Sequence, residues 1–212
     1  MQNIIVVGAS GYGREVFQYV KDAAQHTGEF SAKGLLDDDP RLLDAVGGGA
    51  IIGDTHTYQV QGDDRFLISA GAPDLRETLA QRLAKRGAEF FTLIHPTAYV
   101  APTARVGAGC ILSPYASVGS YAELDEHVLL VMYASVAHDS RVGRYSSFSP
   151  YSAVAGGSTI GRKVFLGAYA LVAPLRQVGE ESKIAAGSVV YRDVPERSLA
   201  TGNPAKILPG SY

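Results

Sequence analysis

The 212-residue chain has no tryptophan and only one cysteine. The single thiol, Cys110, cannot form an internal disulfide or supply a cysteine-based zinc cluster. Lysine and arginine (19 residues) nearly balance aspartate and glutamate (21), which gives a formal net charge of −2, and the chain contains no block of basic residues. The sequence therefore lacks the electrostatic footprint of a nucleic-acid-binding protein or of a polybasic membrane-surface protein.

Long hydrophobic runs are also missing. No apolar stretch approaches the roughly 20 residues that a bilayer-spanning helix requires. Met1 is followed almost at once by strand-like residues, without a basic segment of the signal-peptide type. We therefore expect a cytoplasmic, soluble protein with no membrane partner and no nucleic-acid partner. The abundant residues are glycine (24) and tyrosine (12), a composition that suggests many tight turns and few long surface helices.

Residues 1–92 alternate between the hydrophobic periods of strands and helices. Between the first two apolar runs, and again after Pro73, apolar residues recur at helical spacing; the first pattern ends near Gln25 and the second at Lys85-Arg86-Gly87. A loop of glycines at 47–49 precedes the third run. The strand-type runs are residues 3–8, 30–36, 50–52 and 66–70. Strands separated by helices predict a small, Rossmann-like parallel α/β domain.

From Ile94 onward the hydrophobic period changes to six. Seventeen consecutive positions at this spacing carry Ile, Leu, Val or Phe. They are Ile94, Val100, Val106, Leu112, Val118, Leu124, Leu130, Val136, Val142, Phe148, Val154, Ile160, Leu166, Val172, Val178, Ile184 and Val190. A second track, two positions earlier, is small or Val at every repeat except Arg176. Neither an α-helix nor a hairpin has this period.

A solenoid of short strands accounts for the period. In each six-residue unit the large residue fills the interior, the small residue lets the wall close in, and glycine or another compact residue turns the corner. Three strands make a triangular coil of 18 residues, so residues 93–212 are predicted to form an all-β parallel helix of about five coils with a C-terminal tail. Cys110 is expected to be buried. A charge in the interior is costly, so we expect a local bulge after Pro174 that turns Arg176 outward.

Residues 18 apart lie above one another in such a solenoid. Tyr115, Tyr133, Tyr151 and Tyr169 should therefore form a ladder along one corner, which we interpret as packing, either between coils or between subunits. The same spacing places His138 next to Gly156, with Ser120 on the other side. Asp139 falls between Tyr121 and Gly157.

Four short motifs carry a resemblance to a known family. They are Gly8-Ala9-Ser10-Gly11-Tyr12-Gly13 after the first strand, Ile94-His95-Pro96-Thr97-Ala98 at the junction, Val136-Ala137-His138-Asp139 at a corner, and Gly202-Asn203-Pro204-Ala205-Lys206 near the end. With the repeat, they make nearly the whole chain resemble the hexapeptide-repeat acyltransferases with a left-handed β-helix. Within this class it is similar to the bacterial nucleotide-sugar N-acetyltransferases and the sialic-acid O-acetyltransferase-like proteins.

The resemblance implies acetyl-CoA as acyl donor, no metal, and a homotrimer with active sites between adjacent β-helices. It assigns His138 as general base, Asp139 as its acidic partner and the backbone N–H of Gly156 as the oxyanion donor. An imidazole, with an ordinary pKa near 6.5, suits the removal of a proton from an attacking amine or hydroxyl. The implied acetyl-CoA contacts are Gly156, Gly157, Ala173, Ala186 and Lys206. Without the family, a His-Asp pair on a solenoid corner would more often be a solvated surface pair.

The glycine loop after the first strand is the implied binding site for the acceptor. A strand-to-helix glycine loop lets a phosphate approach the backbone at a helix N-terminus. Its spacing is G-x-x-G-x-G, not the dinucleotide spacing, so NAD is not indicated; a tight turn without a ligand is the alternative. The implied acceptor contacts are Gly8, Ser10, Gly11, Tyr12, Gly13, Asp37, Asp38 and Gly71.

The remaining histidines do not indicate a metal site. His127 and His138 are eleven residues apart, which is not a multiple of the coil, so the three-histidine zinc site of the γ-class carbonic anhydrases, which share this type of helix, is not predicted. His26 and His56 are expected at the surface.

Four positions depart from the family pattern. Tyr12 replaces a usual histidine, Ala72-Pro73 replaces two polar residues after Gly71, Val131 replaces an asparagine, and Ser147 replaces a second active-site histidine. Three hypotheses follow. The protein transfers an acetyl group to an amino group of a nucleotide-linked sugar, or it acts on a hydroxyl or a non-nucleotide acceptor, or it is a catalytically silent binding or assembly subunit.

Overall fold

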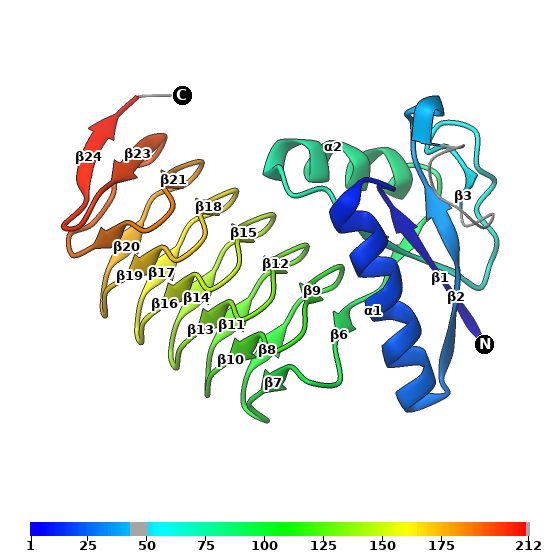
Figure 1. Ribbon diagram of the computed structural model, residues 1–212, viewed down its shortest axis with the longest axis horizontal. Coiled ribbons are helices and arrows are strands. Elements are labelled where there is room, and N and C mark those ends of the chain that lie inside the picture. Colours follow the sequence, from blue (N-terminus) through cyan, green and yellow to red (C-terminus); the bar gives the residue numbers. More distant parts are fainter. Residues whose placement is uncertain (43–50, 211–212) are drawn as a thin grey trace.

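The computed structural model describes residues 1–42 and 51–210. Two parts are visible in Figure 1, a sheet flanked by helices at the N-terminal end and a solenoid of stacked coils that continues to the C-terminus. The predicted glycine loop at 47–49 and the first residue of the predicted strand 50–52 lie outside the described residues.

The N-terminal part is a five-stranded parallel sheet in the order β3-β2-β1-β4-β5. The helices are α1 (Gly11–Thr27) and α2 (Pro73–Ala84), with a short 3-10 helix η1 (Pro40–Leu42). The strands are β1 (Gln2–Val7), β2 (Phe30–Leu36), β3 (Ile51–Gly53), β4 (Asp64–Ile68) and β5 (Glu89–Phe90). This order confirms the Rossmann-like prediction; the two-residue β5 was not predicted, since it is too short to show a period.

Alternate residues of β1 face the two helices. Ile4 and Val6 pack with α1 in one core cluster, and Ile5 and Val7 pack with α2 in another, all of them buried. A strand that is apolar on both faces is what a parallel sheet covered by helices on both sides requires. The continuous apolar run at the start of the chain is therefore explained by burial on two faces.

The solenoid has three walls, which we number in the order in which the chain enters them. The first wall contains β6 (Leu93–Ile94), β9 (Ile111–Leu112), β12 (Leu129–Leu130), β15 (Ser147–Phe148), β18 (Phe165–Leu166), β21 (Lys183–Ile184), β23 (Ser198–Thr201) and the antiparallel β24 (Lys206–Pro209). The second wall contains β7 (Tyr99–Val100), β10 (Ser117–Val118), β13 (Ser135–Val136), β16 (Ala153–Val154), β19 (Leu171–Val172) and β22 (Val189–Val190). The third wall contains β8 (Arg105–Val106), β11 (Glu123–Leu124), β14 (Arg141–Val142), β17 (Thr159–Ile160) and β20 (Gln177–Val178).

The 18-residue register predicted from the sequence is confirmed along all three walls. Ser117 pairs with Ser135, Glu123 with Arg141, and so on up to the last coil, where Lys183 pairs with Leu199 at an interval of 16. The large-residue track forms one buried cluster from Leu112 to Val190, and Cys110 is buried in the same cluster. The fold is therefore an α/β domain followed by a left-handed parallel β-helix, as predicted.

The glycines of the repeat were expected to turn the corners, but in the structure most of them allow neighbouring coils to approach closely. The residue in the left-handed region at each corner is usually not glycine, as at Tyr133 (φ 60°) and Asp139 (φ 58°). Gly119, by contrast, must be glycine because a Cβ there would lie 2.7 Å from the backbone nitrogen of His138 in the next coil. Glycine thus permits close approach of coils, and longer side chains accept the unfavourable φ.

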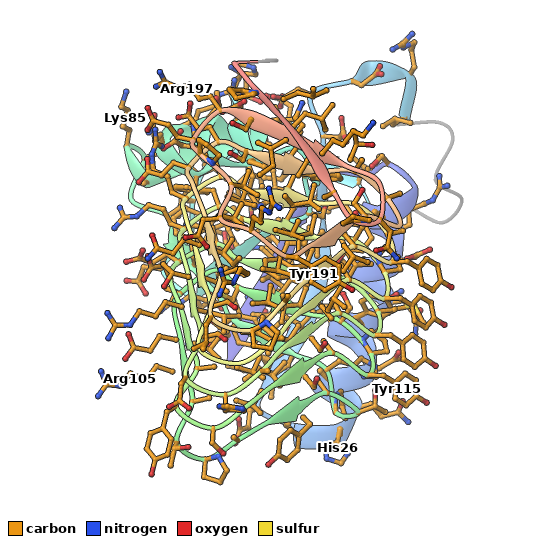
Figure 2. All side chains as sticks on the ribbon, turned by 90° about the vertical axis from the view of Figure 1, so that its left-hand side faces the viewer. His26, Lys85, Arg105, Tyr115, Tyr191 and Arg197 are labelled. Atoms are coloured by element: carbon orange, nitrogen blue, oxygen red, sulfur yellow. The ribbon has the colours of Figure 1, made fainter. Side chains whose placement is uncertain are left out.

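The tyrosine ladder forms along the corner between the first and second walls, which we call the tyrosine corner. Neighbouring rings stack with centroid distances of 5.0, 4.7 and 4.9 Å. Inter-coil stacking, one of the two predicted interpretations, is therefore confirmed. The rings remain 41–64% exposed, and the column that begins at Tyr115 stands out from the surface (Figure 2).

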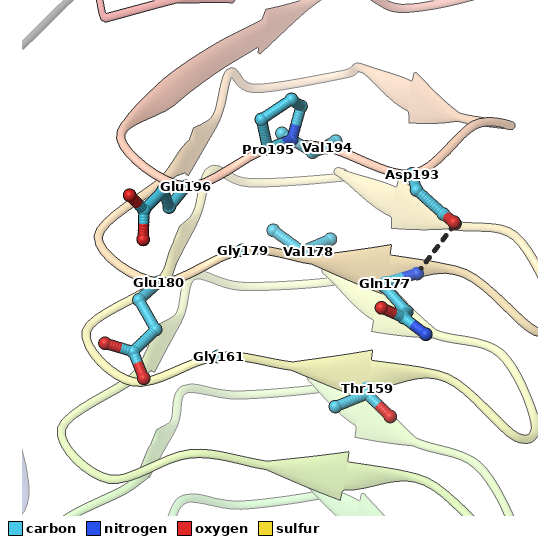
Figure 3. A pocket seen from close by; sticks show the side chains of 10 residues that line it. All are labelled: Thr159, Gly161, Gln177, Val178, Gly179, Glu180, Asp193, Val194, Pro195 and Glu196. Atoms are coloured by element: carbon cyan, nitrogen blue, oxygen red, sulfur yellow. Dashed lines mark hydrogen bonds between the residues drawn. The ribbon is translucent and has the colours of Figure 1, made fainter.

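The predicted bulge at Arg176 is wrong, although the side chain does leave the interior. Thr159 pairs with Gln177 in unbroken register, and the Arg176 guanidinium donates to the Pro174 carbonyl 3.1 Å away. It can leave without a bulge because the next coil is two residues shorter: Val178 bridges to Val194. The Asp193 carboxylate there accepts the hydrogen bond from the Gln177 N–H at 3.0 Å (Figure 3).

The N-terminal part packs on the outer face of the first wall. Leu93, Ile111 and Leu129 of that wall belong to the same buried cluster as α1. None of the described residues forms a helix long and apolar enough to cross a bilayer.

His127 lies on the corner between the third and first walls, which we call the docking corner. Its ring stacks on Tyr145 at a centroid distance of 5.0 Å and meets the edge of Phe90 from β5. Its Nδ1 is buried and has no hydrogen-bond partner among the described residues. Burial, followed by the nearby Arg76 cation, lowers the pKa of His127 to about 4.

Replacing His127 with Phe should stabilise the protein, most of all at low pH. The unfolded chain binds a proton near the ordinary pKa of 6.5 and the folded chain only near 4, so stability falls as the pH drops between these values, by at most about 3 kcal/mol. Chemical unfolding at pH 7.5 and pH 4.5 should show a smaller loss for His127→Phe than for the wild type. An equal loss in both, or the same gain in the exposed-site control His26→Phe, would contradict the assignment.

Candidate active site

The corner between the second and third walls carries His138 and Asp139 and is called here the histidine corner. The His138 Nδ1 lies 2.7 Å from the Asp139 carboxylate, while the Asp139 backbone N–H donates to the Ser120 carbonyl of the preceding coil. The carboxylate fixes the ring so that Nε2 carries the lone pair. Both side chains are more than 60% exposed in the single chain. The imidazole is therefore oriented and accessible, as a base that meets an incoming substrate must be.

Gly156 lies directly against the His138 ring. A Cβ on Gly156 would be 2.6 Å from both Cε1 and Nε2 of the imidazole, a distance that no side chain tolerates. Among the described residues no acceptor takes a hydrogen bond from the Gly156 N–H. The stacking predicted from the 18-residue spacing therefore brings a free backbone donor to the histidine, which is the arrangement needed to stabilise an oxyanion beside a base.

The residues predicted to contact acetyl-CoA fall into two groups. Gly157 donates its N–H to the His138 carbonyl at 2.9 Å, and Ala173 continues the same corner one coil further on. Ala186 lies instead on the tyrosine corner, one coil beyond Ala168, and Lys206 is exposed on β24. A single chain does not bring the two groups together.

The glycine loop forms one wall of a cavity of about 290 Å³. The predicted residues Gly8, Ser10, Asp37 and Asp38 line it. Gly8 has φ 106°, a conformation that favours glycine, and the Asp37 carboxylate accepts a hydrogen bond from the Ala9 N–H at 2.6 Å. The loop is thus held open at the N-terminus of α1, where backbone N–H groups attract anions.

The Asp38 carboxylate is committed to a local network. Thr55 donates to it through both its backbone N–H and its hydroxyl, and Arg82 donates at 2.6 Å. Although partial burial opposes it, these hydrogen bonds lower the pKa of Asp38. His56 is exposed, as predicted, but its Nε2 lies 3.4 Å from the same carboxylate. His26 is also exposed.

A second cavity, of about 260 Å³, lies between the N-terminal part and the first wall. Ser10, Tyr12 and Gly71 are predicted site residues that line it, and it shares Ser10, Ser69, Ala70 and Leu75 with the first cavity. The remaining lining residues are Leu129, Val131, Ser147, Phe148, Ser149 and Phe165. None of these residues carries a charge, and the Tyr12 hydroxyl hydrogen-bonds to Ser113 at 3.0 Å.

Gly11 and Gly13, also predicted, line neither cavity. Gly11 begins α1 with open space around it, whereas a Cβ on Gly13 would lie 1.9 Å from the Gly8 carbonyl oxygen. The role of Gly13 is therefore to let the helix approach the strand.

The histidine corner does not belong to these cavities in the same chain. The second cavity faces the first wall, and the first cavity is lined by the N-terminal part alone. His138 stands where the second and third walls meet, opposite the first wall across the buried interior. His138 and the candidate acceptor cavities are therefore on opposite sides of the molecule.

A larger cavity of about 580 Å³ lies on the third wall beside the shortened coil (Figure 3). Glu180, Asp193 and Glu196 line it, and no predicted site residue does. Glu180 pairs with Arg162 and Asp193 supports the strand ladder, so this groove follows from the missing two residues. The described residues contain no group of three or more side chains placed to hold a metal ion.

Sequence reasoning missed Arg76, which the structure buries between the two parts of the molecule. The signal was present in α2. Arg76, Leu79, Ala80 and Leu83 share one buried stripe at helical spacing, whereas the apolar Leu75 is 52% exposed and borders both cavities. An arginine on the apolar stripe of a helix is a sign of a buried hydrogen-bonded cation.

The comparisons with known proteins agree with this geometry. Residues 3–83 match the family model of the PglD N-terminal domain. The chain is similar to the UDP-N-acetylbacillosamine N-acetyltransferase of Bacillus subtilis, at 31% identity over 117 residues, 53% of this chain; the match spans about half (51%) of that curated relative.

Two solved structures match over almost the whole chain. The acetyltransferase domain of PglB from Neisseria gonorrhoeae, in complex with acetyl coenzyme A, has a TM-score of 0.88 and 28% identity, covering 98% of this chain and 99% of that one. PerB from Caulobacter crescentus, in complex with CoA and GDP-perosamine, has a TM-score of 0.85 and 31% identity, covering 98% and 97%.

The β-helix and its histidine corner define a protein of the hexapeptide-repeat acyltransferase class. Within that class, the full-length match to PerB and the PglD-type N-terminal domain show that the chain belongs to the PglD-type family of sugar N-acetyltransferases.

Replacing Gly13 with Ala should destabilise the N-terminal part by about 3 kcal/mol or more, because the new methyl group meets backbone and not a movable side chain. The matched change Gly11→Ala, at an open helical position, should be neutral or stabilising by up to about 1 kcal/mol. Thermal unfolding of the two variants measures the difference. Equal midpoints would show that the contact between Gly13 and Gly8 is not tight.

Proposed function

We propose that the protein transfers the acetyl group of acetyl-CoA to an amino group of a nucleotide-linked amino sugar, with His138 as general base. The observation that carries this proposal is the histidine corner, where one imidazole is oriented by Asp139 and lies against the free N–H of Gly156. Support comes from PerB, a relative crystallised with CoA and GDP-perosamine.

The amine attacks the thioester carbonyl carbon, and its nitrogen forms the new C–N bond. The His138 Nε2 takes the proton that the attacking nitrogen sheds, while Asp139 stabilises the imidazolium through Nδ1. When the C–S bond breaks, the same proton passes to the departing CoA thiolate. Proton transfer of this kind contributes roughly 10²–10⁴ in rate.

The Gly156 N–H is the donor for the carbonyl oxygen as that oxygen gains negative charge. This N–H donates to no acceptor among the described residues, so substrate binding does not have to break an existing hydrogen bond. Loss of a single donor of this type commonly costs about 10²–10³ in kcat. Gly157 and Ala173 continue this corner and would lie along the acetyl-CoA chain.

The acceptor would occupy the two adjacent cavities, of which the second reaches the first wall. The diphosphate would meet the N-terminus of α1 at Ser10, and Asp37 or Asp38 would accept from the nucleoside hydroxyls. The sugar would enter the uncharged second cavity beside Tyr12 and Gly71. With no carboxylate in that cavity to stabilise an ammonium ion, the neutral amine, which is the nucleophile, is favoured there.

A complete site requires a second copy of the chain, because base and acceptor cavities lie on opposite sides of one prism. We propose a homotrimer in which the second wall packs against neighbours. Its strands expose Tyr99, Ser117, Ser135, Ala153, Leu171 and Val189, none of them charged, whereas the third wall exposes Arg105, Glu123, Arg141, Thr159 and Gln177. The histidine and tyrosine corners border the second wall on its two sides, which would bring Ala186 of one copy toward the histidine corner of the next.

A reaction that consumes acetyl-CoA and a nucleotide sugar takes place in the cytoplasm, which is the location we propose. The proposal is tested by following thiol release from acetyl-CoA with GDP-perosamine, a UDP-linked 4-amino sugar and the matching 4-hydroxy sugars. We expect turnover with at least one amino sugar and none with its hydroxyl counterpart. Turnover only with hydroxyl sugars, or with no sugar at all, would contradict N-acetylation.

Replacing His138 with Ala should reduce kcat by about 10²–10⁴ and leave the KM for acetyl-CoA nearly unchanged, since the base acts on the transferred proton and not on donor affinity. The control is His26→Ala, an exposed histidine on α1 away from the cavities, which should retain wild-type rates. Steady-state kinetics with the best sugar from the panel measures both. If the His138→Ala enzyme keeps the full wild-type rate, His138 is not the general base.

A further inference from the structure

Arg76 is a buried cation that is held entirely by neutral acceptors. Only 1% of the residue is exposed. Its guanidinium donates to the carbonyl oxygens of Ala70, Gly71, His127, Tyr145 and Ser146 and to the hydroxyl of Ser147. Among the described residues no carboxylate lies within ion-pair distance of it. Burial lowers the pKa of Arg76 to about 10, so the group remains charged at neutral pH.

The acceptors come from the two parts of the molecule. Ala70 and Gly71 follow β4 in the N-terminal part, while His127 and Tyr145 lie on the docking corner of the β-helix and Ser146 and Ser147 lead into β15. His127 and Tyr145 have positive φ, and their carbonyl oxygens take no strand-ladder hydrogen bond. When the N-terminal part covers this corner those carbonyls leave water, and a buried acceptor without a donor costs roughly 1–3 kcal/mol. Arg76 supplies donors to them from one side chain.

His127 and Tyr145, whose carbonyl oxygens accept hydrogen bonds from Arg76, are 18 residues or one full coil apart. His138 lies between them in the sequence, within that coil. The guanidinium therefore fixes the N-terminal part at the level of the solenoid that carries the proposed base. In a ring of copies related by rotation about an axis along the prism, the same coil lies at the same height in every copy. The acceptor cavities of one chain are then level with the His138 of its neighbour.

Arg76 also joins the two sides of the second cavity. Gly71 lines that cavity from the N-terminal part and Ser147 lines it from β15. The Ser147 hydroxyl accepts from Arg76 at 2.7 Å and donates to the Gly71 carbonyl at 2.7 Å. Both groups at this edge of the cavity are therefore tied to one guanidinium, and α2 extends from the sheet toward β15 at this point (Figure 1).

We propose that Arg76 is the positioning residue of the acceptor site, which sets the height and the shape of the cavity relative to a neighbouring copy's base. This inference rests on the proposed function. Arg76 does not touch the histidine corner, so its loss should weaken use of the acceptor and leave use of the donor unchanged.

The test compares Arg76→Met with the wild type. We expect the KM for the nucleotide-linked amino sugar to rise at least tenfold, while the KM for acetyl-CoA changes less than twofold. Arg76→Lys, which keeps the charge but not the planar set of five donors, should show a smaller rise in the same direction, and it serves if Arg76→Met does not fold. A purely structural loss would lower the active fraction without separating the two KM values.

The matched control is Lys163→Met. Lys163 also joins the β-helix to α2, through ion pairs to Asp74 and Glu77, but it lines neither acceptor cavity. Its loss should change the acceptor KM less than threefold. An equal rise in Lys163→Met and Arg76→Met would mean that any weakening of the contact between the two parts has the same effect, which would overturn the proposal.

Hydrogen exchange separates this proposal from the proposed function. In Arg76→Met the amides of residues 70–72 and 145–148 should exchange at least tenfold faster than in the wild type, and those of β10 and β13 should not change. If the wild type turns over no amino sugar, the proposed function fails. The exchange pattern alone then decides whether Arg76 holds the N-terminal part against the β-helix. Unchanged exchange, or faster exchange with an unchanged acceptor KM, would overturn the inference.

Discussion

The stacking of coils at an 18-residue interval is the constraint on which the rest of the structure depends. Each wall strand forms backbone hydrogen bonds with the corresponding strands of the coils before and after it. Up to the last coil, the residues above and below any position are therefore those 18 positions away in the sequence. The contact between His138 and Gly156 is one result, and the stacked tyrosines are another. The contacts of Arg76 with His127 and Tyr145, one coil apart, are a third result. A shift of one coil would change all of them together.

This constraint also explains how much could be predicted from the sequence. The β-helix, its register and the approach of Gly156 to His138 follow from a period that seventeen residues repeat, and the α/β sheet follows from its buried runs. The two-residue β5 and the antiparallel β24 could not be predicted, because they are too short or lie outside the repeat. The partners of Asp38 could not be predicted either, since Thr55 and Arg82 approach it from distant parts of the chain. The sequence correctly predicted that Arg176 leaves the interior, because a buried charge is costly, but it wrongly predicted a bulge. The next coil is two residues shorter, and the hydrophobic period does not reveal this.

The departures from the family pattern become coherent in the structure. Tyr12 and Ser147 stand where the resemblance implies histidines, and both form hydrogen bonds that join the N-terminal part to the first wall, with Ser113 and with Gly71. Together with Val131 they give a cavity without charged lining. The altered positions thus change the lining of the second cavity, while the histidine corner holds the proposed base, its carboxylate partner and the Gly156 N–H. The proposed function therefore assigns acceptor choice and acetyl transfer to opposite sides of each prism.

The most direct test of this division is complementation between two inactive chains. His138→Ala removes the base, and Gly71→Phe fills the second cavity at a position where a Cβ meets no other atom. Each variant alone should be inactive. Co-expressed in equal amounts and isolated as mixed trimers, they should regain about a third of the wild-type activity, since one site in three pairs an intact base with an intact cavity from a different chain. Mixed oligomers with no more activity than the two separate variants would show that the base and the cavity act within one chain, and would contradict the account.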